Sequence, residues 1–230
     1  MISSSRILRS CFALFFFGLL IVPAVHAQEF ASSMELEYEL THSLPSPPQD
    51  SLKPIHRHPL LPSNISILES TVWGEDGLLR STGIAPPLTP DERRAELQLR
   101  RTMLSIHQIG GFVTLGLMAS TVYYGQLVYN GDRQYLRTHK TLVAATILSY
   151  TTTGLLALLS PPPYIRRDEV STITVHKWFA WLHITGMIVT PIVGGMLRHS
   201  MNYNQLAKLH LISGYVTLGA LTGAMVSVTF

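Results

Sequence analysis

Four apolar segments, near residues 102–127, 139–160, 173–196 and 207–229, constrain this chain more than any other feature of its sequence. Each is about 20 residues or longer, and a helix of that length crosses roughly 30 Å of hydrocarbon at about 1.5 Å per residue. The connections between the segments are short, which favours antiparallel neighbours. The sequence therefore predicts an all-α membrane protein with an up-down four-helix transmembrane bundle in contact with membrane lipid.

The overall composition agrees with a membrane protein. Only 13% of the residues are charged, whereas ordinary globular domains carry about a quarter. The net charge is +3, and the basic residues are scattered or near helix ends. This pattern lacks the clustered basic surface of a nucleic-acid-binding protein, so we expect no nucleic-acid partner.

Residues 1–27 are typical of a secretory signal peptide. Arg6 and Arg9 precede an apolar core, and small residues lead up to a cleavage point after Ala27. An uncleaved anchor helix is the alternative. The only cysteine, Cys11, lies inside this signal. A mature chain without a thiol excludes disulfides, iron–sulfur ligation and covalent attachment of c-type haem.

Residues 28–100 are polar, and six prolines between residues 43 and 62 predict an extended linker. A short helix or strand is expected between Ile65 and Leu79. The run Thr89-Pro90-Asp91-Glu92 is a helix start, with Thr89 as N-cap and Glu92 completing a capping box. We expect that helix to continue into the first span, and residues 101–230 to form the four-helix domain.

The signal predicts an integral protein of the bacterial cytoplasmic (inner) membrane, with residues 28–100 extracytoplasmic. The count of Lys and Arg in the loops favours the opposite orientation. We base the expected topology on the signal, because it decides which way the chain starts.

Polar side chains within a membrane are costly and usually functional. Four histidines lie within the first two turns of their own spans: His107, His139, His176 and His210. Because successive spans start on opposite sides, the first and third histidines share the outer side, and the second and fourth share the inner side. An iron porphyrin takes one axial ligand on each face, and neutral imidazole supplies it without adding charge. The sequence thus predicts two haem b groups, held by His107–His176 and His139–His210, with irons roughly 15–20 Å apart.

The surroundings of two of these histidines are alike. Residues 107–116 match residues 210–219 at seven of ten positions. Small residues follow each histidine at i+3 and i+4 on the same helix face, where they would let a flat macrocycle approach the backbone. These residues are Gly110, Gly111, Ser213 and Gly214. The alternative is that the histidines hydrogen-bond between helices and that the glycines serve helix packing.

A fifth histidine, His183, lies seven residues after His176, on the same face and deeper in the span. It could replace His176 as ligand, contact a haem edge or propionate, relay protons, or be a buried hydrogen-bonded side chain. We expect His176 to be the ligand, because its depth matches that of His107.

Over about residues 100–230 the chain resembles the cytochrome b561 family, the ascorbate-dependent transmembrane reductases. The resemblance is carried by four histidines at intervals of 32, 37 and 34 residues and by Val175-His176-Lys177-Trp178. It implies a four-helix core with one haem-binding histidine per helix, paired first with third and second with fourth. Members often have a further helix on each side of this core, and residues 28–100 match no module that we identify.

We expect a di-haem b-type cytochrome that carries electrons across the membrane. It would act either alone, as an oxidoreductase that reduces ferric chelates or monodehydroascorbate, or as the membrane subunit of a redox complex docked through residues 28–100. The donor would be a quinol or an ascorbate-like compound. The resemblance implies substrate-side basic residues, and interfacial anchoring is the alternative for them. The candidates are Arg137, Lys140, Lys208 and Lys177.

A different class of function is a non-redox membrane protein whose histidines bind or transport metal ions. Transport would favour a polar path with carboxylates, and Asp and Glu are absent from all four predicted spans.

Overall fold

The structure, a computed structural model, describes residues 59–165 and 171–229. Apart from Thr229, these residues belong to one compact unit, Arg57–Val228. The described residues form helices and no strand. The predicted signal peptide with its cleavage point, and most of the predicted linker, lie outside them.

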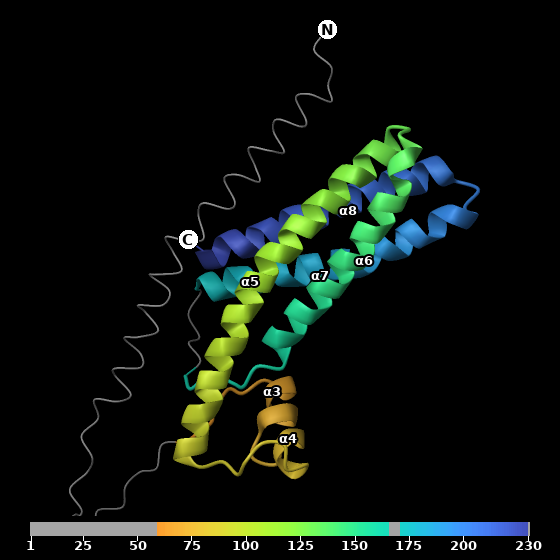
Figure 1. Cartoon of the computed structure of the whole chain (residues 1–230). Coiled ribbons are helices and arrows are strands. Elements are labelled where there is room, and N and C mark those ends of the chain that lie inside the picture. Colours follow the sequence, from red (N-terminus) through yellow and green to blue (C-terminus); the bar gives the residue numbers. More distant parts are fainter. Residues whose placement is uncertain (1–58, 166–170, 230) are drawn as a thin grey trace, which may run out of the picture. The chain divides into compact units, whose positions relative to one another are not determined.

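Two short helices, α3 (Ile67–Trp73) and α4 (Leu78–Ser81), precede the long ones (Figure 1). Ser66 and Glu69 form a capping box at the start of α3, which explains why the helix begins there. The chain turns back after α4 at Gly83, whose φ of 75° favours glycine. Of the short helix or strand expected between Ile65 and Leu79, the structure shows a helix, and a second short helix follows it.

Helix α5 (Pro90–Tyr129) has 40 residues and begins at the predicted residue, with the Thr89 half of the predicted capping box formed. Pro90 occupies the first turn, and the Thr89 hydroxyl accepts a hydrogen bond of 3.3 Å from the Glu92 N–H. At about 1.5 Å per residue the helix is roughly 60 Å long, about twice the hydrocarbon thickness of a bilayer. Its first third therefore extends beyond the apolar span, and the helix continues into that span as expected.

A short 3₁₀ helix, η1 (Arg133–Tyr135), leads into α6 (Leu136–Leu158). Helix α7 (Thr172–Met196) ends in a second one, η2 (Leu197–His199), and α8 (Tyr203–Thr229) follows. Helices α5, α6 with η1, α7 and α8 are long and apolar enough to cross a membrane.

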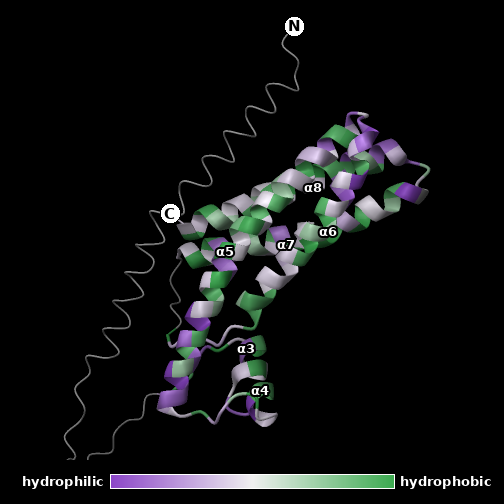
Figure 2. Ribbon diagram, in the orientation of Figure 1, coloured by the Kyte–Doolittle hydropathy of each residue, from purple (hydrophilic) through white to green (hydrophobic). Residues whose placement is uncertain are grey.

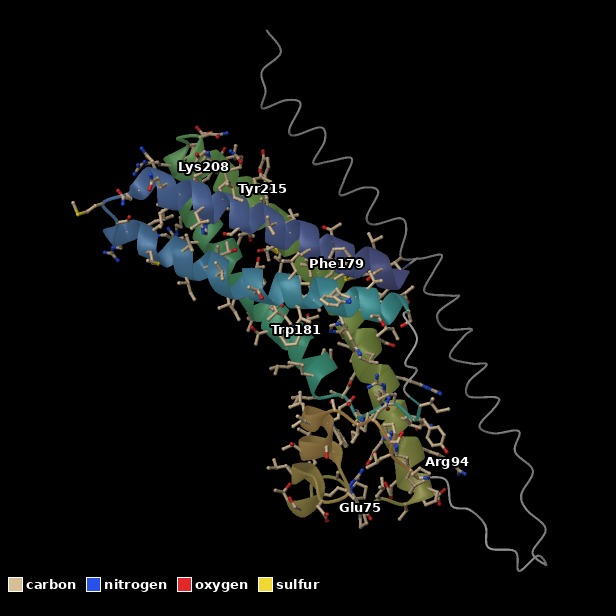
Figure 3. The ribbon with its side chains drawn as sticks, turned by 180° about the vertical axis from the view of Figure 1, so that it is seen from behind. Glu75, Arg94, Phe179, Trp181, Lys208 and Tyr215 are labelled. Carbon is tan, nitrogen blue, oxygen red and sulfur yellow. The ribbon has the colours of Figure 1, made fainter. Side chains whose placement is uncertain are left out.

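Apolar residues cover much of the four long helices, and polar residues gather toward their ends (Figure 2). Large apolar side chains stay exposed on the bundle, among them Trp181 on α7, which is 70% exposed (Figure 3). In a water-soluble bundle such side chains would face inward, so this surface suits contact with lipid.

Contacts along the bundle make each long helix antiparallel to the next. Helices α5 and α6 form one hairpin and α7 and α8 another, and α5 also packs antiparallel to α8 (Figure 1). We call α5 with α6 the first hairpin and α7 with α8 the second. This is the up-down arrangement of neighbours that short connections favour.

A buried ion cluster ties the short helices to the start of α5. Glu96 on α5 binds Arg80 at 2.6 Å and Arg93 at 2.9 Å, and all three side chains are about 5% exposed or less. Arg93 also donates to the carbonyl oxygens of Pro162 and Pro163 in the α6–α7 connection. The described part of the polar segment is therefore folded against α5.

Candidate functional site

The four histidines predicted as ligands meet in two pairs, which we call the first pair, His107–His176, and the second pair, His139–His210. The ring centres lie 6.4 Å apart in the first pair and 6.1 Å apart in the second. In both pairs the ring planes stand 85° apart. All four rings are partly exposed. Each pair takes one ring from each hairpin, as the pairing of first with third and second with fourth span predicts.

Every one of these rings is held by a backbone carbonyl of the neighbouring helix in its own hairpin. In the first hairpin, His107 Nδ1 donates to the Thr153 carbonyl at 2.8 Å, and His139 Nδ1 donates to the Thr121 carbonyl at 3.0 Å. The bonds are reciprocal, because each helix supplies one donor ring and one acceptor carbonyl. They fix where both rings of the hairpin lie.

The second hairpin repeats this arrangement. His176 Nδ1 donates to the Ala224 carbonyl and His210 Nδ1 to the Thr190 carbonyl, both at 2.9 Å. In all four helices the acceptor carbonyl belongs to the residue fourteen positions after that helix's own histidine. The two hairpins of the bundle thus have the same pattern of histidine-to-carbonyl hydrogen bonds.

These bonds define the protonation of each ring. A carbonyl oxygen only accepts hydrogen bonds, so Nδ1 carries the proton in all four histidines. In a neutral ring the other nitrogen, Nε2, then holds a free lone pair, which is the form that ligates metals. Two rings in this state cannot hydrogen-bond to each other, because neither Nε2 has a proton to donate.

Two glycines make room for the rings of the second pair. A Cβ on Gly125 would lie 2.9 Å from Cε1 of His139, and a Cβ on Gly194 would lie 2.7 Å from Cε1 of His210. Each glycine comes four residues after the carbonyl that holds the same ring, Thr121 in α5 and Thr190 in α7. The absence of a side chain lets each ring lie against the neighbouring backbone.

The small residues that the sequence singles out face neighbouring helices. A Cβ on Gly110 would lie 2.5 Å from Oγ1 of Thr153 in α6, and one on Gly111 would lie 2.9 Å from Sδ of Met225 in α8. Ser213 accepts a hydrogen bond from the Thr190 hydroxyl at 3.1 Å. Gly110 and Gly111 thus lie at close contacts between helices, as the alternative interpretation expects, whereas a Cβ on Gly214 would make only ordinary contacts at 3.9 Å.

A layer of polar side chains separates the two pairs, and each member lies seven residues after its helix's histidine. Three members are buried threonines whose hydroxyls bond a partner on the other helix of their hairpin. These contacts are Thr114 with Ser149, Thr146 with Thr121, and Thr217 with Thr190. Hydroxyls paired in this way place polar groups in an apolar bundle without leaving them unsatisfied.

His183 is the fourth member of this layer. It is 8% exposed, and its Nδ1 lies 2.9 Å from the Tyr150 hydroxyl on α6. Its ring centre lies 5.6 Å from that of Tyr150, with the planes nearly perpendicular. Of the functions considered for His183, the buried hydrogen-bonded side chain describes its contacts in the structure. His176 and not His183 forms the ring pair with His107.

The four basic candidates are all exposed: Arg137, Lys140, Lys177 and Lys208. Lys140 and Lys177 each follow a paired histidine directly. Lys208 lies near the start of α8, at the end of the bundle away from Glu75 in the α3–α4 turn (Figure 3). Exposed cations at helix ends fit interfacial anchoring and anion binding alike.

Among the described residues, no three or more His, Cys, Asp and Glu side chains lie close enough to share one metal ion. The candidate site therefore consists of two separate pairs of imidazoles. A group with its own equatorial ligands needs only such a pair, whereas a bare metal ion in a protein takes four ligands or more, as a rule.

Comparisons with protein-family models, with curated proteins and with solved structures give no match to this chain.

Proposed function

We propose that this protein is a di-haem b-type cytochrome that carries electrons across a membrane. The proposal rests above all on the two imidazole pairs, whose rings are held at Nδ1 and leave Nε2 free. His107 and His176 would hold one haem b, and His139 and His210 the other. Haem iron supplies one-electron oxidation and reduction when it is bound.

The separation of the rings supports this proposal. Two metal–imidazole bonds of about 2.0–2.1 Å, with about 1.1 Å from each nitrogen to its ring centre, correspond to ring centres about 6.2–6.4 Å apart when the rings oppose each other. The two pairs show 6.4 Å and 6.1 Å. Both separations are therefore close to the value that two opposed metal-bound rings would show.

The protein's own contribution is to orient the rings. The carbonyls of Thr153, Thr121, Ala224 and Thr190 fix each ring and its tautomer. A hydrogen bond from Nδ1–H to a carbonyl also makes the other nitrogen a better ligand. The apolar helices around the rings limit access of water, which favours retention of an apolar macrocycle.

We further propose the orientation in which residues 28–100 lie outside the cytoplasm of a bacterial inner membrane. The first pair is then the outer one and the second pair the inner one. The exposed Arg137, Lys140 and Lys208 would meet anionic substrates on the inner side, and Lys177 on the outer side. The function would be that of a cytochrome b561-like reductase with a quinol or ascorbate-like donor. In the other variant the chain is the membrane subunit of a redox complex docked through residues 28–100.

A metal-ion binding or transport protein is the second candidate class. The imidazole pairs could contribute two ligands to a metal ion, but the described residues bring no third ligand to either pair. The first proposal needs only the ligands that are present, so we favour it.

Four single substitutions test the assignment of ligands. His107→Ala and His176→Ala should each remove the same haem and leave the other, because each deletes one axial ligand of the first pair. His139→Ala and His210→Ala should do the same for the second pair. Haem per chain and the redox titration of each purified variant are measured. Retention of both haems in His176→Ala, with loss of one in His183→Ala, would overturn the choice of ligand.

A further inference from the structure

The two hairpins are held together differently from the helices within them. Within each hairpin, reciprocal ring-to-carbonyl bonds and paired hydroxyls join the helices. Each imidazole pair spans the boundary between the hairpins, so the spacing of its rings depends on how the hairpins meet. The side chains that bond across this boundary therefore bear on both proposed haem sites.

Tyr215 and Tyr150 each form a hydrogen bond across the boundary. Tyr215 on α8 donates to Gln126 Oε1 on α5 at 3.0 Å, and Tyr215 is 45% exposed. Tyr150 on α6 and His183 on α7 form the other at 2.9 Å, in the polar layer between the imidazole pairs, where His183 is buried. The Tyr150–His183 bond is partly buried, and a hydrogen bond with less access to water is stronger than an exposed one.

The Tyr150–His183 bond lies next to both components of the first pair. Tyr150 is about one turn before Thr153, whose carbonyl holds the His107 ring. His183 is two turns after His176 on the same face of α7. The bond therefore joins the part of α6 that orients one ring to the helix that carries the other. His139 of the second pair lies about three turns away on α6.

His183 also differs from the proposed ligands in how it is held. Its layer position carries threonine in the other three long helices. Those threonines bond within their own hairpins, and His183 bonds across the boundary between hairpins. Its Nδ1 meets a hydroxyl, whereas the Nδ1 of each paired histidine meets a backbone carbonyl. A longer side chain is needed here because the partner lies on the other hairpin.

We propose that the Tyr150–His183 hydrogen bond sets how the two hairpins meet at the His107–His176 pair, which makes His183 a positioning residue and not an axial ligand. This inference rests on the proposed di-haem function. It implies that removing the bond changes the relative orientation of the two rings while both haems stay bound. The redox equilibrium of the haem at the first pair then shifts, and that of the haem at the second pair stays as it was.

The test compares Tyr150→Phe with Tyr215→Phe in the full-length protein purified in detergent. Each substitution deletes one hydroxyl that bonds across the hairpin boundary, one in a partly buried bond and one in an exposed bond. Haem per chain, the electron paramagnetic resonance (EPR) spectrum of the ferric protein and the reduced-to-oxidised ratio of each haem at fixed potential are measured. The single-ligand variants of the first and second pairs identify which signal belongs to which haem.

Tyr150→Phe should keep two haems per chain and move the EPR signal of the haem at the first pair. That haem's reduced-to-oxidised ratio should change by about two- to tenfold, which is the effect of one hydrogen bond. Tyr215→Phe should match the wild type. His183→Leu should reproduce the shift, and the double variant should shift no further, since both changes delete the same bond.

His183→Asn provides a rescue, because its amide can occupy the position of Nδ1 and bond to Tyr150. It should resemble the wild type more than His183→Leu does, and the two can be compared even if Tyr150→Phe is too unstable to purify. Loss of a haem in His183→Leu would overturn the inference by making His183 a ligand, as would wild-type signals in both Tyr150→Phe and His183→Leu. Absence of haem from the wild type would instead refute the proposed function.

Discussion

The ring of His107 stands at 85° to the ring of His176, with 6.4 Å between their centres. The second pair repeats the angle at 6.1 Å. The angle follows from the hydrogen bonds at Nδ1, because each ring is oriented by a carbonyl of a different helix. Because the two hairpins have the same histidine-to-carbonyl hydrogen bonds, the two imidazole pairs have nearly the same geometry.

This angle predicts the EPR spectrum of the oxidised protein. In low-spin ferric haem, near-perpendicular axial imidazoles give a highly anisotropic signal, and parallel imidazoles give a more rhombic one. Both haems should therefore show the highly anisotropic form, measured on frozen protein in detergent. A rhombic signal from either haem would contradict the ring orientation at that site.

Close packing against Gly194 predicts a selective loss at the second pair. Gly194→Ala would place a Cβ 2.7 Å from Cε1 of His210 and force that ring away. Changing a residue that supports a metal ligand usually weakens metal binding by about 10–100-fold. The haem at the second pair should therefore be depleted. Haem per chain is measured after dilution of the purified protein. Gly195→Ala is the matched control, since a Cβ there meets nothing within 4 Å. Equal haem content in the two variants would contradict the proposed contact.

The buried ion cluster predicts where the protein is sensitive to loss of charge. Arg93→Ala would remove one of the two cations that bind Glu96. It would also remove the three hydrogen bonds that Arg93 donates to backbone carbonyls. Breaking a buried ion pair in this way typically costs about 3–5 kcal/mol, and the described part of the chain before α5 should become sensitive to limited proteolysis. Arg94→Ala provides the control, because Arg94 is 67% exposed in its pair with Asp91 (Figure 3). Exposed pairs contribute little, and equal sensitivity of the two variants would exclude the cluster as the anchor.

Features with local signals in the sequence are reproduced by the structure. The span predicted at 173–196 is Thr172–Met196, and the helix start at Pro90 is placed correctly, because hydropathy and capping act over a few residues. The pairing of His107 with His176 follows from the depth of each residue in its helix and the alternation of the helices. Both the depth of a residue and the alternation of the helices can be predicted without knowing any side-chain contact.

The parts of the site that could not be predicted depend on contacts between helices. The acceptor carbonyls have no signal of their own, because a backbone oxygen is the same at Ala224 as at Thr153. Gly125 and Gly194 are two of 16 glycines, and only the packed bundle shows which of them lie against a ring. The Tyr150 partner of His183 lies on another hairpin.

Arg93 is a charged residue whose surroundings cannot be predicted from the sequence alone. In the sequence it is one of several basic residues that precede the first span, and a count of Lys and Arg includes it. In the structure it is 2% exposed and bonded to Glu96 and to the proline-rich connection. Its charge is paired within the fold, which the sequence alone does not show.

The reduced absorption spectrum, with haem quantified per chain, tests the central claim most directly. Protein expressed with adequate haem supply, purified and reduced with dithionite should show b-type haem bands at two haems per chain. A preparation with the four histidines intact and no bound haem would contradict the account.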